Sequence, residues 1–97
     1  MKAFLKDLDK AFENRIRLGI MSALMVNEHL DFTSLKELLG VTDGNLASHL
    51  RSLEKSDYIT FSKSFLDRKP LTRYAATTLG KKAFRKHIRA IEKLLQS

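Results

Sequence analysis

A glycine at residue 40 separates two short segments that both have helical spacing, and this pattern narrows the folds open to the chain. Thr33 or Ser34 can cap the first segment, and Ser34 has Glu37 three residues later, as a capping box requires. Gly40 can adopt the left-handed conformation that ends a helix, and Thr42 can cap the helix that follows. Two short helices joined by a tight turn predict a helix-turn-helix.

Apolar spacing gives each helix of this unit, which spans about residues 33–56, one inward face. The residues expected to face inward are Leu35, Leu38, Leu39, Leu46, Leu50 and Leu53, with Val41 filling the turn. A longer helix is predicted upstream over residues 12–25, where the apolar stripe consists of Phe12, Ile16, Ile20, Ala23 and Leu24. Residues 4–8 favour a short helix before it, and residues 30–32 an extended link after it.

The periodicity changes after residue 57. The next residues alternate and are rich in β-branched and aromatic side chains, which predicts a strand with Ile59 and Phe61 facing inward. The predicted hairpin, a wing of about residues 58–76, consists of a strand at 58–63, a turn at 67–70 and a return strand at 71–76.

Thr77 can cap a long last helix of about residues 77–96 that carries one apolar seam. A small domain cannot easily cover so long a seam, and a large exposed apolar patch usually marks an interface. We therefore expect a homodimer, the alternative being that the seam folds back onto the first helix of its own chain. The predicted dimer interface consists of Phe84, Ile88, Ile91 and Leu95.

Length and composition predict one domain, residues 1–97, because 43% hydrophobic residues in 97 suffice for one core. The absence of cysteine excludes disulfides, thiolate metal sites and thiol nucleophiles. No apolar run approaches the roughly 18 residues that span a bilayer. The amino end also lacks the apolar middle of a secretory signal. We expect no membrane partner and a cytoplasmic location.

The net charge of +7 comes from the last part of the chain, because acidic and basic residues balance over residues 1–56. Such a one-sided basic surface attracts polyanions, either nucleic acid or an anionic membrane. A solvated helix face would have the same composition, and charge alone does not separate these interpretations.

The predicted second helix of the helix-turn-helix carries small and hydrogen-bonding groups opposite its leucines, as an approach to base edges requires. An ordinary polar surface would look similar in isolation, but the basic residues of the wing favour DNA. The residues expected to contact DNA are Thr42, Asp43, Gly44, Asn45, Ser48, Arg51, Lys55, Lys63, Arg68, Lys69 and Arg73, to which the family resemblance given next adds His49.

The chain resembles winged-helix regulators of the MarR and ArsR type, most closely the short winged-helix DNA-binding domains related to both. The resemblance rests on NRIRLGI (residues 14–20), VTDGNLASHL (41–50) with Leu53, the wing residues 65–74, and TTLG (77–80). It implies a mainly α, α+β winged helix-turn-helix with a long carboxy-terminal dimerisation helix. It also implies a transcriptional regulator that binds double-stranded DNA sequence-specifically, with the recognition helix in the major groove and the wing on backbone or minor groove.

Two residues depart from the family pattern. Asp57 replaces the glycine that usually ends the recognition helix, so we expect a left-handed aspartate there. Ala76 replaces a larger apolar residue.

Other classes of function have weaker support in the sequence. Relatives of the ArsR type bind metals through cysteine or carboxylate and histidine, whereas His29, His49 and His87 are dispersed here. We therefore expect no metal and no cofactor, and a regulator of the ArsR type that senses a metal or another ligand is kept as an alternative. No phosphate loop or dinucleotide turn indicates an enzyme. A winged helix that binds an acidic protein partner through its basic wing is an alternative function that the sequence does not exclude. The sequence points to no particular effector.

Overall fold

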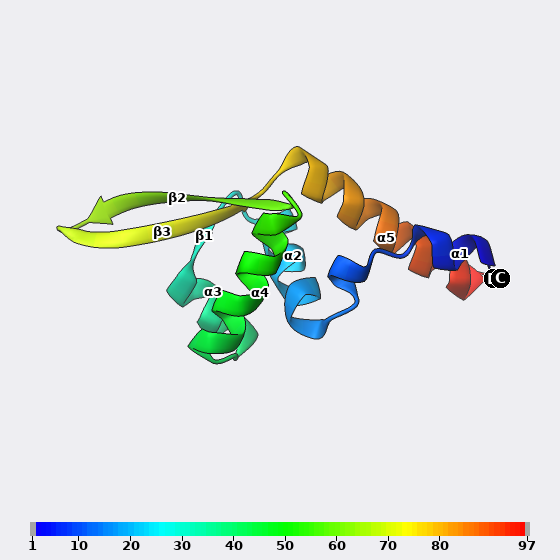
Figure 1. Ribbon diagram of the computed structural model, residues 1–97, viewed down its shortest axis with the longest axis horizontal. Coiled ribbons are helices and arrows are strands. Elements are labelled where there is room, and N and C mark those ends of the chain that lie inside the picture. The colour runs from blue at the N-terminus through cyan, green and yellow to red at the C-terminus, as the bar shows by residue number, and fades with distance from the viewer. Residues whose placement is uncertain (1, 97) are drawn as a thin grey trace.

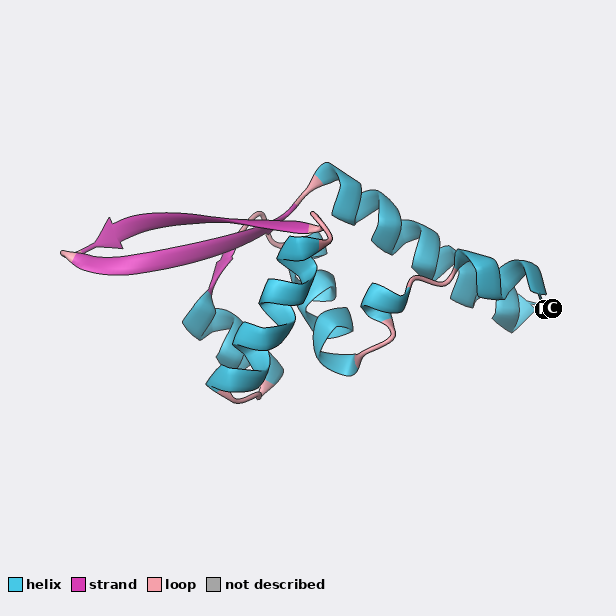
Figure 2. Cartoon of the chain, in the orientation of Figure 1, coloured by secondary structure: helices cyan, strands magenta, loops and turns pink. Residues whose placement is uncertain are grey.

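The computed structural model describes residues 2–96 as an elongated molecule measuring 53 × 25 × 21 Å (Figure 1). The wing forms one end, α1 and the last turns of α5 form the other, and the remaining helices lie between them (Figure 2). The elements in chain order are α1 (Lys2–Asp7), η1 (Lys10–Phe12), α2 (Arg15–Val26), β1 (Leu30–Asp31), α3 (Phe32–Leu39), α4 (Asp43–Lys55), β2 (Ile59–Leu66), β3 (Lys69–Ala76) and α5 (Thr78–Gln96). In this described part of the chain, no helix is long and apolar enough to cross a membrane.

Helices α3 and α4 form the predicted helix-turn-helix. Gly40 ends α3 with a φ of 64°, and the Thr42 side chain accepts a hydrogen bond from Asn45 N at 3.2 Å, so both predicted signals are confirmed. The predicted cap of α3 at Thr33 or Ser34 is wrong. Asp31 caps that helix by accepting from Ser34 N at 2.8 Å, because the helix begins two residues earlier than its apolar pattern indicated.

The leucine stripe of α4 fixes how this helix is rotated in the domain. Leu46, Leu50 and Leu53 are at most 1% exposed, and they join Leu35 in one core cluster. Truncating such a leucine to alanine typically costs about 2–5 kcal/mol. The polar face of α4 is therefore held outward by packing on its other side. Leu38 was expected to face inward, but it is 62% exposed.

Helix α2 begins later than the sequence pattern predicted, because Asn14 caps it by accepting from Ile16 N and Arg17 N, both at 3.0 Å. Phe12 therefore lies in the short turn η1 rather than in α2. It is 2% exposed, and its ring packs against Tyr58 and Phe84 with centroids 5.3 and 5.1 Å apart. The turn thus supplies the aromatic centre of the core.

Asp9 connects the amino-terminal segment to the rest of the fold. Its carboxylate accepts from Ala11 N at 2.9 Å and from the Tyr58 hydroxyl at 2.5 Å, and its amide donates to His87 Nδ1 at 2.9 Å. The hydrogen bond to Asp9, together with burial and the charge of Asp9, raises the pKa of Tyr58 to about 12. The segment before α2 is therefore fixed to both the wing base and α5.

The three-stranded sheet is antiparallel, in the order β1-β3-β2. The wing strands run to a two-residue turn, in which Asp67 and Arg68 have φ values of 52° and 66°. The strands are longer than the sequence pattern indicated. Ile59 is buried as expected, whereas Phe61 is 49% exposed because β2 leaves the core immediately after its first residue.

The junction between α4 and the wing is built on Asp57, which has a φ of 60°. Asp57 N donates to Glu54 O at 2.9 Å and Tyr58 N to Leu53 O at 3.0 Å, the bond pattern of a Schellman motif. The expected left-handed conformation of Asp57 is confirmed. Its side chain is exposed, and it has no hydrogen bond or ion pair with any of residues 2–96.

Helix α5 starts directly on this junction. Thr77 N donates to Tyr58 O at 3.0 Å, and Thr77 Oγ1 donates to Asp57 O at 2.6 Å while accepting from Gly80 N at 2.9 Å, which confirms the predicted cap. A Cβ at Gly80 would lie 2.0 Å from Tyr58 O. Glycine is required here because the helix backbone packs against the backbone of Tyr58, the residue before β2.

We predict that Asp57→Gly stabilises the protein. A left-handed residue other than glycine costs roughly 1–2 kcal/mol, with aspartate among the more tolerant. The gain is partly offset by the freer unfolded chain, which leaves a net increase of about 0.5–1 kcal/mol in the free energy of unfolding. Urea denaturation measures it, with Asp57→Asn as the control that should stay near neutral. Loss of stability in both variants would mean that the carboxylate itself stabilises the fold.

Candidate nucleic-acid interface

The outward face of α4 has the composition of a recognition surface. The residues opposite its leucines are all exposed: Gly44, Ser48, Arg51, Ser52 and Lys55. A Cβ placed on Gly44 would meet no atom within 4 Å, so packing does not explain this glycine. The surface therefore leaves room for a ligand to approach the backbone at the start of the helix.

The amino end of α4 carries the exposed residues Thr42, Asp43 and Asn45. The Asp43 carboxylate pairs with Lys36 Nζ of α3 at 2.8 Å. This ion pair offsets a negative charge that would otherwise repel phosphate. The structure thus gives Asp43 an intramolecular partner, whereas Asn45 remains available for base edges.

His49 lies at the edge of this face and is held by α2. Arg17 Nη1 lies 3.0 Å from His49 Nδ1, and Arg17 Nε donates to Ala11 O at 2.7 Å. Because a guanidinium only donates, Nδ1 must accept, and the neutral ring carries its proton on Nε2. Burial and the positive charge of Arg17 both lower the pKa of His49 below its usual value of 6.5.

The sequence interpretation missed Arg17, although it lies in the NRIRLGI stretch that carried the family resemblance. Helical spacing predicts that Arg17 lies beside the buried apolar stripe of α2. Its contact with His49 depends on the packing of α2 against α4, which no local pattern specifies.

The basic residues of the wing fall into two groups. Arg68 and Lys69 lie at the turn, whereas Lys63 lies farther back along β2, paired with Thr72, and all three are exposed. Arg73 lies closer to the base, paired in register with Asp31 of β1 and Ser62 of β2. The pKa of Asp31 is lowered mainly by hydrogen bonding from Ser34 and also by the charge of Arg73. All four basic residues therefore lie on one hairpin, with Arg73 one pair closer to its base than Lys63.

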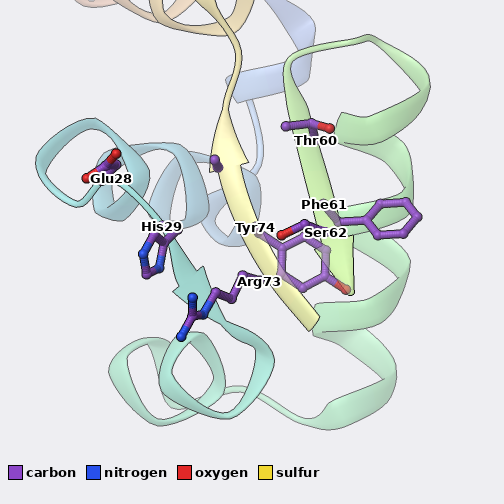
Figure 3. Close-up of a pocket in the computed structure, with 8 residues that line it drawn as sticks. Glu28, His29, Thr60, Phe61, Ser62, Arg73 and Tyr74 are labelled. Carbon is purple, nitrogen blue, oxygen red and sulfur yellow. The ribbon is translucent and has the colours of Figure 1, made fainter. Parts of the chain in front are cut away.

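Arg73 also lines a shallow cavity of about 370 Å³ beside the sheet (Figure 3). Its side chain extends toward His29, and Glu28 lies on the adjoining loop (Figure 3). The other lining residues are Thr60, Phe61, Ser62, Tyr74 and Ala75. Over residues 2–96, no three His, Cys, Asp or Glu side chains are grouped so that they could hold a metal ion.

The predicted seam of α5 is only partly exposed. Phe84 is 7% exposed and packs edge-on against Phe12, so it belongs to the core of its own chain. Ile88 is half-buried at the margin of that core, Ile91 is 36% exposed and Leu95 is 80% exposed. The sequence predicted a seam exposed from Phe84 onward, and this prediction is wrong for Phe84, because Phe12 of η1 covers it. His87, also on α5, is 3% exposed and accepts from the Asp9 amide.

Comparison with known proteins identifies the family. The winged helix DNA-binding domain family matches residues 16–95. A protein of unknown function from Methanocaldococcus jannaschii is 35% identical over 85 residues, which cover 88% of this chain and 92% of that protein. The chain therefore belongs to the winged helix DNA-binding domain family.

Solved structures agree with this assignment. The transcriptional regulator homologue from Pyrococcus horikoshii OT3 has a TM-score of 0.86 at 28% identity, covering 98% of this chain and 92% of that one. NadR, solved in complex with 4-hydroxyphenylacetate, has a TM-score of 0.74 at 22% identity over 99% of this chain and 67% of its own, a likeness of fold alone. Family and fold define a DNA-binding transcriptional regulator rather than an enzyme.

We predict that His49 makes stability depend on pH. Its pKa is lowered in the folded state, so between that value and 6.5 the unfolded chain binds more protons. The contribution of His49 is complete above about pH 6.5 and is lost as the pH falls through the folded-state pKa. Thermal melting at pH 7.5 and 5.5 should show a larger loss for the wild type than for His49→Asn, which keeps an acceptor for Arg17. A ring pKa above 6.5 by NMR would contradict this.

Proposed function

We propose that the chain is one winged-helix unit, acting as a homodimer, that binds double-stranded operator DNA sequence-specifically in the cytoplasm. Helix α4 would enter the major groove by its amino-terminal turns, and the wing would contact backbone or the adjacent minor groove. The observation that carries the proposal is the exposed polar face of α4. The buried leucines on the opposite side of the helix hold this face outward, and no atom of residues 2–96 covers Gly44. The exposed cations near the wing turn supply the attraction to phosphate.

The first two and a half turns of α4, from Asn45 to Arg51, carry the groups that discriminate bases. Asn45 can pair with adenine, Ser48 with several base edges, and Arg51 with guanine or a phosphate. Thr42, Gly44, His49 and Lys55 would border this contact, with the Nε2–H of His49 as a donor to backbone. In this proposal the ion pair with Lys36 offsets the negative charge of Asp43 near the DNA. Arg73 would contribute positive charge from the base of the wing.

The direct test is a gel shift on random-sequence duplex at low salt, followed by selection of preferred sites. Arg68→Ala should weaken binding to all sequences alike and reduce the salt slope by about one unit. Asn45→Ala and Ser48→Ala should lower discrimination at single base pairs by roughly 1–3 kcal/mol. Lys82→Ala, which removes the same charge from an exposed position on α5, is the control and should change neither property. Absence of salt-dependent DNA binding would favour a protein-docking role instead.

The proposed dimer would use the apolar surface between α2 and α5. Met25, Phe84 and Ile88 line an open groove there of about 310 Å³, bordered by Arg85, Arg89 and Glu92. Two-fold symmetry would present two recognition helices to a pseudo-palindromic site. Ile91 and Leu95 extend the same helix face beyond the groove.

We predict that Ile88→Glu produces a monomer of 11.1 kDa, because a carboxylate would be buried in an apolar interface. Sedimentation equilibrium at micromolar concentration measures it. Leu38→Glu, at an exposed position on α3, is the matched control and should remain dimeric. A wild-type protein that already sediments as the monomer would rule out the dimer.

A further inference from the structure

The tip of the wing carries large apolar side chains that the domain does not bury. Phe65 is 77% exposed and Leu66 is 58% exposed, and neither packs against the hydrophobic core. Phe65 pairs in register with Pro70, and Leu66 with Lys69. The turn that joins them consists of only Asp67 and Arg68, so the apolar groups lie at the narrow end of the hairpin.

Strand alternation sets the direction in which Phe65 points. Side chains two residues apart share one face of a strand, so Phe65 and Lys63 lie on the same face of β2 as Ile59. Ile59 is buried in the cluster that contains the leucines of α4. Phe65 thus continues the face of β2 that begins at Ile59, but it lies in the outer part of the hairpin, which projects beyond α3 and α4 (Figure 1).

The location of the tip argues against cover by a second copy through the proposed dimer face. The tip and the ends of α1 and α5 lie at opposite ends of a molecule 53 Å long (Figure 1). Around the apolar residues lie three cations, Lys63, Arg68 and Lys69, and one anion, Asp67, so the charge of the tip is net positive. Exposed apolar side chains flanked by basic residues are complementary to double-stranded DNA, which has phosphates on its outside and stacked bases inside.

We propose that Phe65, with Pro70 across the strand, is a wedge that enters the minor groove, separates two stacked base pairs and bends the duplex. This inference rests on the proposed DNA-binding function. Proteins that bend DNA from the minor groove use Phe, Leu and Pro in this way. The two wing strands have eight residues each and are roughly 26 Å long at 3.3 Å per residue. This length exceeds the minor-groove depth of about 7.5 Å, so the wing is long enough for its tip to reach the floor of the groove.

The groove dimensions explain why insertion must deform the DNA. Paired strands are about 4.8 Å apart, and side chains add to that width, whereas the minor groove is only about 6 Å wide. The tip can enter only where the groove opens. Unstacking a base step opens it, and pyrimidine–purine steps unstack most readily. The wedge would therefore add a preference for flexible steps next to the sequence that α4 contacts.

The experiment measures bending by energy transfer between dyes at the two ends of a duplex that carries a site selected by the wild-type protein. The wild type should bend this duplex by an angle in the range of about 20–90°. Phe65→Ala should lose most of the bend and bind about tenfold more weakly, the scale of one lost stacking contact. Phe65→Leu should retain both properties. Leu79→Ala, at a 54% exposed apolar position on α5, is the control, and thermal melting verifies that each variant folds.

The outcomes separate the wedge from the function on which it rests. Binding by the wild type without a bend, or an unchanged bend in Phe65→Ala, overturns the wedge and leaves DNA binding intact. Failure of the wild type to bind any duplex overturns the proposed function and the wedge with it. Binding of the wild type to phosphatidylserine vesicles that Phe65→Ala abolishes, with DNA bending unchanged, would assign the tip to a membrane surface.

Discussion

The backbone contact between Tyr58 and the first turn of α5 is the constraint on which the rest of the structure depends. Tyr58 O accepts from Thr77 N, and the contact is close enough that a Cβ at Gly80 would lie 2.0 Å from the same oxygen. Three elements meet here, because Tyr58 follows the end of α4, precedes the wing and supports α5. A shift at this point would move the recognition helix, the wing and the helix proposed for dimerisation relative to one another.

Hydrogen bonds around the junction make it rigid. The amides of the left-handed Asp57 and of Tyr58 each donate one backbone hydrogen bond to the end of α4, and the Asp57 carbonyl accepts from Thr77 Oγ1 at 2.6 Å. On the other side, the Tyr58 hydroxyl donates to Asp9, whose amide donates to His87 of α5. The aromatic ring of Phe12 fills the space between these groups. Packing and hydrogen bonding thus hold the two proposed DNA-contacting elements in one geometry, the pre-organisation that base recognition requires.

The sequence predicted those features that depend on local patterns. Gly40, Thr42, the leucines of α4 and the Thr77 cap follow from helix-end chemistry and apolar periodicity, and the structure has each of them. The left-handed Asp57 was predicted from the family resemblance, because it replaces the glycine that usually ends the recognition helix, and such helix ends favour this conformation.

The errors arose where tertiary contacts override a local signal. Phe12 continued the apolar period of α2, yet Asn14 caps the helix after it, and the ring turns into the core. Phe84 fitted a dimer seam, but the same displaced turn covers it. The contacts of Arg17 and Lys36 could not be predicted from the sequence. Arg17 contacts His49, which is distant in the sequence. Lys36 pairs with Asp43 across the turn between α3 and α4, and only packing brings these two together.

The most direct test of this arrangement is a backbone amide NMR titration of the intact protein with a selected duplex. The amides of residues 42–52 at the start of α4 and of residues 63–70 at the wing tip should shift together in one saturable transition. Those of the exposed face of α5, from Arg85 to Leu95, should remain in place. Shifts confined to α5, or shifts at the wing without any in the first turns of α4, would contradict a recognition helix positioned by the Tyr58 junction.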